Sequence, residues 1–491
     1  MPLFFLALTP RVHILRALLP AVVLAAPWAF SSPAWAMSEI KFPAELIQSF
    51  TKEGIAKGEW SAYALPVEPT VQRRTIAFAQ GERDLQNPAS VTKLFTTGYA
   101  MDMLGTGFAY KTGFMADAEP ENGVLRGNLY IKGSGDPVFL SSDLWESLRR
   151  LRARGVRKIS GSIVLDRTAF LAAGQTEATA DAEDFDETAY RAYNAVPDAL
   201  LLNHGAMGLD ISVVEGRVRV SSLDAPSNWA FVSNLTPAKG ECGAWKNGLN
   251  IQFKKQKDEV VVNVSGAYAT RCGSNRLPIR IAQQDWLWES WIREIWKQLG
   301  GEFNGEVIAG ATPNTTIALY THVGKPLTEV IRTVNKWSNN VMARHLELTM
   351  TTTPGEFDQK VRAWLNSKGV STPGWVLENG SGLSRSTRID AKGLSEYLAY
   401  MARRADFPDF FASLPRAGAD GTMARRMKNV DEFAYLKTGS LNGVRTIGGY
   451  VRSRNGQLWA IGVMVRGANA GNAWTPMENL VKMLYNKGSE D

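Results

Sequence analysis

Apolar and polar residues recur with different periods in successive stretches of the chain. Near the start, residues 44–58 have the apolar spacing of a helix, and two runs typical of strands follow at 60–67 and 75–79. From Ser90 onward, apolar side chains recur every three or four residues until Gly105, which favours the end of a helix. Ser90 is therefore expected at the start of a long helix packed against the core.

The middle of the chain, from about Tyr110 to Pro278, has a different pattern. Short alternating runs separated by turn residues predict strands at 124–132, 158–165, 206–214, 217–222 and 259–267. The acidic, small-residue segment Thr176–Glu187 predicts a mobile loop. We interpret this stretch as a β-rich insertion.

Helical spacing returns after the insertion and then alternates with strands. Helices are expected at 284–299, 326–337, 340–350, 357–367, 392–405 and 476–485, and strands at 434–437, 446–452 and 459–465, the last two joined by a turn at Asn455-Gly456. The first of these helices carries an apolar stripe typical of a core face rather than of a sugar platform: Trp288, Trp291, Ile292, Ile295 and Leu299. The pattern predicts an α/β domain formed by 37–109 and 279–491, split by the insertion at 110–278.

Residues 1–36 have the pattern of a secretory signal peptide. Arg11 and Arg16 give a positive start, an apolar run interrupted by prolines follows at 17–30, and Ala34-Trp35-Ala36 matches a cleavage signal. An uncleaved anchor is the alternative, but this run is too short to cross roughly 30 Å of hydrocarbon. We expect cleavage after Ala36, no transmembrane anchor and a periplasmic location.

Charge and cysteine content narrow the partners and the compartment. The formal net charge is +7, and basic residues alternate with acidic ones, so no polybasic tract indicates nucleic-acid binding. A mild positive field favours an acidic polymer. Cys242 and Cys272 are the only cysteines, and an even count in an oxidising compartment favours one disulfide over two unpaired thiols. No cofactor or metal site is expected, because CxxC and zinc-ligand spacings are absent.

Three short motifs carry the candidate chemistry: Ser90-Val-Thr-Lys93, Ser338-Asn339-Asn340 and Lys437-Thr438-Gly439. Residues three apart on a helix share a face, so the Lys93 amine is expected beside the Ser90 hydroxyl. Serine needs a neighbouring base to act as a nucleophile, and a lysine is a base only when burial and a nearby cation lower its pKa. Lys437, brought in on a strand, would supply that cation.

The remaining motif residues suit the other parts of an acyl transfer. Ser338 could relay a proton to the leaving amine, and Asn340 could orient the lysine and bind the substrate amide. The Thr438 hydroxyl suits a terminal carboxylate, and the backbone N–H groups of Ser90 and Ser440 could form an oxyanion hole. The candidate catalytic residues are Ser90, Lys93, Ser338, Asn340 and Lys437, and the candidate substrate-binding residues are Thr438, Gly439 and Ser440.

Each motif alone is weak evidence, and K-T-G occurs a second time at Lys111-Thr112-Gly113. That earlier copy begins a predicted strand of the insertion and precedes S-x-N, so we treat it as coincidence. The later copy lies on a predicted strand before a Gly-rich hairpin. Order and placement together match the motifs of β-lactamases and penicillin-binding proteins.

The resemblance extends beyond the motifs. Asn87–Thr97 (NPASVTKLFTT) resembles the nucleophile helix of class C low-molecular-mass penicillin-binding proteins, a family of serine D-Ala-D-Ala carboxypeptidases and endopeptidases. The stretches GNLYIKGSGDP (127–137), GSGLSR (380–385) and KTGSL (437–441) resemble other parts of that family. The similarity covers most of the chain after residue 36 and includes the long insertion. One departure is Asn339, where members of the wider superfamily have Asp.

This resemblance implies both a fold and an activity. The implied fold is a transpeptidase/β-lactamase-like α-β-α sandwich with an antiparallel sheet, split by a long β-rich insertion that forms one or two extra domains. The implied activity is cleavage of peptidoglycan stem peptides and cross-links through a Ser90 acyl-enzyme, with β-lactam antibiotics such as penicillin as inhibitors. In the family an acidic residue of the insertion is associated with the peptide side chain. Asp186 is the nearest candidate here, but its acidic loop favours the interpretation that it is a solvated acid without that role.

Rival functions fit the sequence less well. A β-lactamase needs a carboxylate that activates the deacylating water, and Glu347, Glu356 and Glu378 do not have the required spacing. A non-catalytic wall-binding or antibiotic-sensing module is a second alternative. The complete set of motif side chains argues against it. A Ser-His-Asp hydrolase is disfavoured because no G-x-S-x-G occurs.

Overall fold

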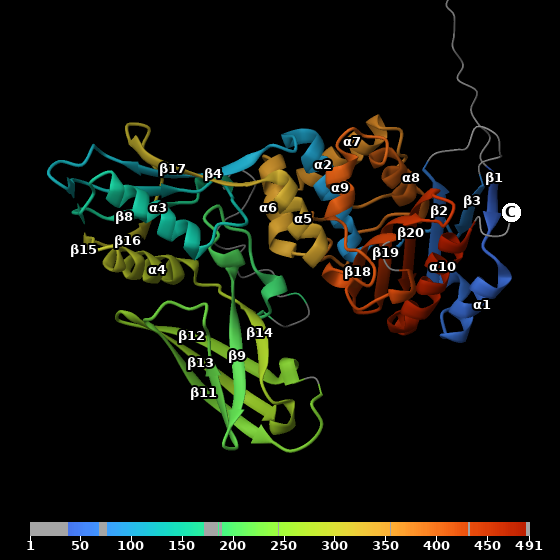
Figure 1. The fold of residues 1–491 in the computed structure, drawn as a ribbon, viewed down its shortest axis with the longest axis horizontal. Coiled ribbons are helices and arrows are strands. Elements are labelled where there is room, and N and C mark those ends of the chain that lie inside the picture. Colours follow the sequence, from blue (N-terminus) through green and yellow to red (C-terminus); the bar gives the residue numbers. More distant parts are fainter. Residues whose placement is uncertain are drawn as a thin grey trace, which may run out of the picture. The chain divides into compact units, whose positions relative to one another are not determined.

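A computed structural model describes residues 38–67, 76–170, 185, 189–243, 245–353, 355–430 and 433–487 (Figure 1). The predicted signal peptide, almost all of the predicted loop at Thr176–Glu187, and Asp186 lie outside the described residues. Within the described residues, no helix has the length and apolar character needed to cross a bilayer.

A six-stranded sheet joins the two ends of the chain (Figure 1). Its strand order is β1-β3-β2-β20-β19-β18, and only β1 and β3 run parallel. The strands are β1 (Ser38–Lys41), β2 (Trp60–Pro66), β3 (Ile76–Gln80), β18 (Ala434–Leu441), β19 (Val444–Arg452) and β20 (Leu458–Arg466). The last three form consecutive hairpins, because the short connections between them allow only antiparallel pairing.

Helices cover both faces of this sheet. Side chains alternate along β2, so that Tyr63 and Leu65 enter one core while Ala62 and Ala64 enter the other. The first core receives α2 (Lys93–Leu104), α5 (Leu327–Trp337), α6 (Asn340–Met350), α7 (Glu356–Ser367), α8 (Ala391–Met401) and α9 (Phe407–Ser413). The second core receives α1 (Ala44–Lys52) and α10 (Trp474–Asn486). The expected α-β-α sandwich is confirmed.

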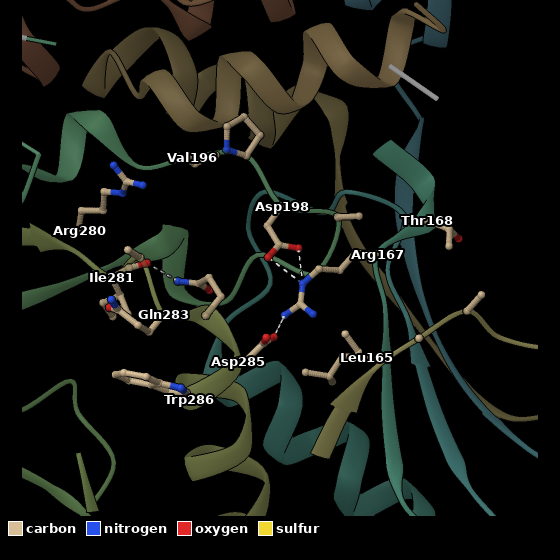
Figure 2. A pocket seen from close by; sticks show the side chains of 17 residues that line it. Leu165, Arg167, Thr168, Val196, Asp198, Arg280, Ile281, Gln283, Asp285 and Trp286 are labelled. Atoms are coloured by element: carbon tan, nitrogen blue, oxygen red, sulfur yellow. Dashed lines mark hydrogen bonds and ion pairs between the residues drawn. The ribbon is translucent and has the colours of Figure 1, made fainter. Parts of the chain in front are cut away.

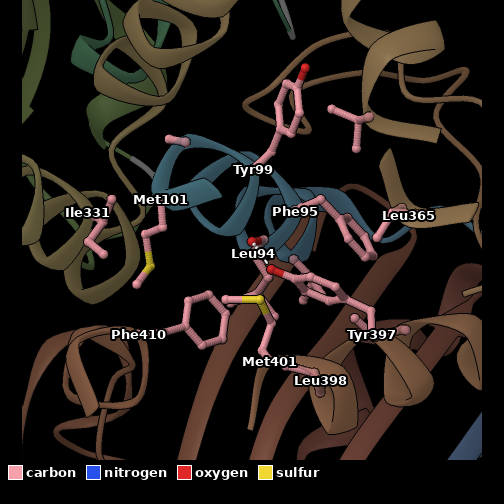
Figure 3. Packing of buried hydrophobic residues seen from close by; sticks show 14 of the residues in the cluster. Leu94, Phe95, Tyr99, Met101, Ile331, Leu365, Tyr397, Leu398, Met401 and Phe410 are labelled. Carbon is pink, nitrogen blue, oxygen red and sulfur yellow. Dashed lines mark hydrogen bonds between the residues drawn. The ribbon is translucent and has the colours of Figure 1, made fainter. Parts of the chain in front are cut away.

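Helix α2 is buried among other helices rather than laid on the surface. Leu94, Phe95, Tyr99 and Met101 pack into an apolar cluster with residues of α5, α7, α8 and α9 (Figure 3). The predicted helix begins with a 3-10 turn, Ala89–Thr92, and ends at Gly105, whose φ of 79° is readily adopted by glycine.

One glycine sets how closely α8 approaches α2. The Tyr397 hydroxyl donates a hydrogen bond of 2.7 Å to the Leu94 carbonyl oxygen (Figure 3). A Cβ atom on Gly98 would lie 2.0 Å from that hydroxyl oxygen. Only glycine at this position allows the contact, although glycine inside a helix is otherwise unfavourable.

Within the described residues, four further sheets are formed by strands of the insertion together with three strands that follow residue 278. Their strand orders are β16-β8-β6-β4-β17, β15-β7-β5, β10-β9-β14 and β11-β13-β12. The strands are β4 (Ala109–Ala116), β5 (Val124–Leu125), β6 (Leu129–Lys132), β7 (Lys158–Ile159), β8 (Ile163–Asp166), β9 (Ala206–Val214), β10 (Arg217–Ser221), β11 (Trp229–Ala238), β12 (Leu249–Gln256), β13 (Glu259–Ala269), β14 (Asn275–Arg280), β15 (Glu302–Phe303), β16 (Val307–Ala309) and β17 (Ile317–Pro326). Cys242 and Cys272 form the expected disulfide, with their Cα atoms 5.0 Å apart.

The insertion is less purely β than the sequence pattern predicted. Helix α3 (Ser141–Ala153) lies inside the stretch interpreted as strands and turns, with Leu144, Leu148 and Leu151 buried at helical spacing. Turn residues lie on both sides of this helix, in Gly133–Pro137 and at Gly155, and they favour strands and turns in the sequence pattern. Helix α4 (Gln284–Gln298) carries the predicted apolar stripe, and its buried residues join the core of the insertion.

Sheet membership bears on where the insertion ends. Strands β15, β16 and β17 all follow residue 278, yet each pairs with a strand of the insertion. The six-stranded sheet resumes only at β18. The division at 37–109, 110–278 and 279–491 stays a prediction, and the pairing favours a second boundary near Pro326.

The close packing of α2 and α8 predicts the effect of a single methyl group. Gly98→Ala should lower the free energy of unfolding by about 1–3 kcal/mol, because the new methyl group overpacks a buried contact. Gly107→Ala is the matched control, since no atom lies within 4 Å of the added Cβ position. Thermal denaturation of both variants measures the difference. Equal melting temperatures would show that α8 can move away from α2 without loss of stability.

Candidate active site

Ser90 lies on the 3-10 turn that leads into α2, and its side chain is half-buried. The preceding residue, Ala89, has a φ of 47°, which is unusual for a residue with a side chain. Asn87 holds this conformation, because its Oδ1 accepts the Ala89 N–H at 2.8 Å and its Nδ2 donates to the Ser384 carbonyl at 2.8 Å. The serine is thus presented on a strained and well-anchored turn.

The Lys93 amine lies among three oxygen atoms. Its Nζ is 2.9 Å from Ser90 Oγ, 2.7 Å from Asn340 Oδ1 and 2.5 Å from the Ser381 carbonyl oxygen. A neutral amine has two N–H donors and one lone pair. If the donors serve the amide and carbonyl oxygens of Asn340 and Ser381, the lone pair faces the Ser90 hydroxyl and can accept its proton.

Burial sets the protonation of the two site lysines. Lys93 and Lys437 are both fully buried, and no carboxylate of the described residues forms an ion pair with either. Loss of hydration lowers the pKa of Lys93 well below its usual value, and the nearby charge of Lys437 lowers it further. Burial also lowers the pKa of Lys437 to about 7. The site therefore favours a neutral Lys93.

Ser338 reaches the site because α5 ends there. It adopts a left-handed conformation, with φ 58° and ψ 38°, directly after the last residue of the helix. Lys437 Nζ donates to Ser338 Oγ at 2.8 Å and to the Thr438 carbonyl at 2.7 Å. The Thr438 hydroxyl lies 2.8 Å from the Thr422 hydroxyl. A chain of polar groups thus runs from the end of α5 to strand β18.

Asn339 and Asn340 have separate tasks at the start of α6. Asn339 is the N-cap, and its side chain accepts the Met342 N–H at 3.1 Å. Asn and Asp cap helices about equally well, which explains why Asn can replace the Asp of the wider superfamily. Asn340 points the other way, with Oδ1 towards Lys93 and Nδ2 donating to the Tyr193 carbonyl at 3.0 Å.

Strand β18 lies close against the turn that carries Ser90. The Thr446 hydroxyl donates to the Pro88 carbonyl at 2.7 Å, and a Cβ on Gly439 would lie 2.5 Å from that same oxygen. Glycine at position 439 is therefore required for this approach. It places Ser440, whose side chain is exposed, one residue beyond the contact.

The structure brings all three motifs together and adds groups that the motifs omit. Lys93 forms hydrogen bonds with both Ser90 and Asn340, and Lys437 forms hydrogen bonds with Ser338 and with the Thr438 carbonyl. Sequence reasoning missed the Ser381 and Tyr193 carbonyls and the Thr422 hydroxyl. Only Ser381 had a signal, because it lies in the stretch 380–385 that carried the family resemblance.

The second K-T-G lies elsewhere. Lys111 is on β4 and exposed to solvent, and β4 pairs with β6 and β17 rather than with the six-stranded sheet. Its resemblance to the site motif is confined to sequence.

The carboxylates considered for a β-lactamase are occupied by other contacts. Glu347 accepts the Gly380 N–H at 2.8 Å and pairs with Arg344 at 3.1 Å. Glu378 accepts the hydroxyls of Ser384 and Ser386, which contribute to lowering its pKa although burial opposes the shift. Glu356 binds backbone N–H groups at the start of α7. None of these three glutamates forms a hydrogen bond or ion pair with Ser90 or Lys93.

Comparison with known proteins gives a consistent result. The profile of the D-Ala-D-Ala carboxypeptidase 3 (S13) family matches residues 51–487. The chain is 25% identical to the D-alanyl-D-alanine carboxypeptidase DacB of Haemophilus influenzae, over 81% of this chain and 85% of the relative. It is 28% identical to a D-alanyl-D-alanine carboxypeptidase of Actinomadura sp. (strain R39), over 76% of this chain and 72% of the relative. The crystal structure of penicillin binding protein 4 from Haemophilus influenzae shares the fold, with a TM-score of 0.74 at 21% identity over 89% of this chain and 99% of that chain.

The position of Lys93 predicts the effect of its removal. Lys93→Ala should slow acylation of Ser90 by a β-lactam by about 10³-fold or more, because the serine loses its base. Lys111→Ala, in the second K-T-G, is the control and should react at the wild-type rate. The rate is measured as adduct formation with benzylpenicillin, and near-normal acylation of Lys93→Ala would exclude this lysine as the base.

The two lysines also predict a pH dependence. Because Lys437 has a pKa of about 7, its positive charge is present mainly below that pH, where it opposes protonation of Lys93. Replacing it by a neutral side chain in Lys437→Met should let Lys93 keep its proton to higher pH, so the acidic limb of the acylation profile should move upward. Lys111→Met is the control, and an unmoved acidic limb in Lys437→Met would contradict the coupling.

Proposed function

This chain belongs to the D-Ala-D-Ala carboxypeptidase 3 (S13) family, and from that premise we propose that it is a serine D-Ala-D-Ala carboxypeptidase and endopeptidase of peptidoglycan stem peptides. One observation carries the proposal: the buried Lys93 amine touches both the Ser90 hydroxyl and the Asn340 amide oxygen. That arrangement activates a serine without a histidine or a metal ion.

The first step of the proposed reaction is acylation. Ser90 Oγ attacks the carbonyl carbon of the penultimate D-Ala while its proton passes to Lys93 Nζ. The backbone N–H groups of Ser90 and Ser440 receive the developing oxyanion. The C–N bond then breaks, and the leaving amine takes a proton through Ser338, whose hydroxyl contacts Lys437 at 2.8 Å.

The second step is hydrolysis of the acyl-enzyme. Water attacks the ester carbonyl, transfers a proton to the site, and releases the shortened peptide and free Ser90. A cross-linked peptide presents the same D-Ala carbonyl with a different amine as leaving group, so the same groups serve endopeptidase cleavage.

Recognition of the peptide terminus is assigned to strand β18 and its neighbours. A free carboxylate suits the Thr438 hydroxyl, which the Thr422 hydroxyl orients at 2.8 Å, and the Lys437 cation lies one residue away. Gly439 keeps strand β18 close to the 3-10 turn that carries Ser90. Asn340 Nδ2 is engaged with the Tyr193 carbonyl, so binding of a substrate amide there would require an exchange of partners.

β-Lactam antibiotics are proposed to enter the same first step. Ring opening acylates Ser90 but leaves the departing amine tethered to the acyl group, where it obstructs the attacking water. The engaged state of Glu347, Glu356 and Glu378 supports slow release of this adduct over β-lactamase activity.

We place the enzyme outside the cytoplasm. The leader at 1–36, with cleavage after Ala36, and the disulfide between Cys242 and Cys272 support export to the periplasm.

A mass measurement tests the proposed function. Brief exposure of the protein to benzylpenicillin should add the mass of one penicillin, and Ser90→Ala should show no adduct. The wild type should also release D-Ala from a D-Ala-D-Ala-terminated stem peptide, with the activity lost in Ser90→Ala. Consumption of the drug without an adduct would identify a β-lactamase, and neither reaction would indicate a binding or sensing module.

A further inference from the structure

The insertion contains a cavity of about 620 Å³ that the proposed chemistry does not use (Figure 2). Four separate segments line it: the end of β8 and the residues after it, the stretch Val196–Ala199, the link from β14 into α4, and the residues after β16. This volume lies in the range of sites that bind small molecules or one or two sugar rings, about 300–1,000 Å³.

The charged groups of the lining balance one another. Arg167 Nε donates to both carboxylate oxygens of Asp198, at 2.9 and 2.8 Å, and its Nη2 lies 2.7 Å from Asp285 Oδ1 (Figure 2). Arg280 also lines the cavity, so the described lining carries two arginines and two aspartates. A strongly charged ligand would disturb this balance of charges. A neutral polar ligand can instead form hydrogen bonds with the guanidinium and carboxylate groups while their ion pairs stay intact.

Two lining side chains point to the kind of neutral ligand. Gln283 Oε1 is buried and has no hydrogen-bond partner among the described residues, so it is an acceptor waiting for a donor. Trp286 is half-buried on the first turn of α4 and lines the same cavity (Figure 2). It packs against the core of the insertion without being one of its fully buried members, so part of its indole faces the cavity.

An N-acetylated amino sugar meets each of these features. If the Gln283 amide turns towards the cavity, the acetamido N–H can donate to its Oε1. The acetyl methyl suits the apolar wall that includes Leu165 and Ile281, and the ring can lie against the Trp286 indole. Its hydroxyls can bond the outward edges of Arg167 and Asp285. The exposed fraction of the Asp285 side chain is 63%, so its carboxylate can reach such a ligand.

The cavity is connected to the candidate active site by one short segment. Val196 to Ala199 form part of its wall, and Tyr193, three residues earlier, accepts the hydrogen bond from Asn340. Asp198, another wall residue, donates its N–H to His345 Nε2 on α6 at 3.2 Å. Three residues span at most about 11 Å, so the wall of the cavity begins within that distance of the Tyr193 carbonyl that Asn340 binds.

We propose that this cavity binds an N-acetylated amino sugar of the glycan strand, so that the enzyme holds its substrate by the sugar while the attached stem peptide reaches Ser90. The proposal rests on peptidoglycan being the substrate. It assigns to the insertion a binding site for the glycan, separate from the groups that perform the acyl transfer.

The test compares two substrates that differ only in the sugar. D-Ala release is measured for a disaccharide-pentapeptide and for the same pentapeptide without sugar. The wild type should have a kcat/KM about tenfold higher for the sugar-bearing substrate. Gln283→Leu, which keeps the side-chain volume, should lower that preference roughly three- to tenfold, as expected for one hydrogen bond, and Trp286→Ala should abolish it.

Both variants should keep wild-type activity on the sugar-free peptide and wild-type acylation by benzylpenicillin. Trp145→Ala, at an exposed tryptophan on α3, and Gln298→Ala, at the far end of α4, are the matched controls and should keep the sugar preference. A wild type without sugar preference, or variants that lose activity on both substrates, would overturn the proposal.

A binding measurement separates failure of the sugar site from failure of the proposed function. The disaccharide of N-acetylglucosamine is titrated into the wild type and into Gln283→Leu by calorimetry. Binding that the substitution weakens would support the site even if neither peptide is cleaved. D-Ala release and penicillin acylation without disaccharide binding would leave the proposed function standing and remove the sugar site.

Discussion

The site depends on one costly arrangement, a lysine amine buried without a carboxylate partner among the described residues. Removing an ammonium group from water disfavours its charged form strongly, so the surroundings of Lys93 lower its pKa and favour the neutral amine. A neutral amine still needs partners for its two N–H groups, and the Asn340 amide and the Ser381 carbonyl provide them. The remaining lone pair then has one polar neighbour, the Ser90 hydroxyl. A carboxylate in the same place would restore the ammonium ion and remove the base.

The fold supplies this environment by joining parts of the chain that are far apart in sequence. Helix α2 is enclosed by helices from the second half of the chain, and Gly98 lets Tyr397 close the apolar layer around it. On the other side, Gly382 permits the Ser381 loop to approach, since a Cβ there would lie 2.0 Å from the Ala89 carbonyl oxygen. Gly439 does the same for β18. Glycine is needed at these positions because backbones must meet where a side chain would keep them apart.

These contacts also explain what could be predicted from the sequence. Lys93 follows Ser90 at helical spacing, and the motifs fix Asn340 and Lys437, so their meeting was predictable from order and placement. The Ser381 and Tyr193 carbonyls were not, because a backbone group leaves no mark on residue type. The apolar pattern predicted an α/β domain split by an insertion, and the family resemblance implied the α-β-α sandwich. Helix α3 did not, because turn residues surround its three buried leucines, and the pairing of β15 to β17 depends on long-range register that local patterns do not contain.

The insertion is bound to the site through α6, which makes it part of the chemical apparatus rather than an appendage. His345 on α6 accepts the Asp198 N–H through Nε2, so its Nδ1 carries the proton and donates to the Gly135 carbonyl at 2.8 Å. Burial lowers the pKa of His345 to about 4, and the ring therefore stays neutral and keeps both bonds at ordinary pH. Gly135 belongs to the stretch 127–137 that resembles the family, although no residue of that stretch forms a hydrogen bond with Ser90 or Lys93. The hydrogen bond between Gly135 and His345 gives a physical reason for this resemblance. It holds helix α6 in place, and Asn340 at the start of α6 in turn positions the Lys93 amine.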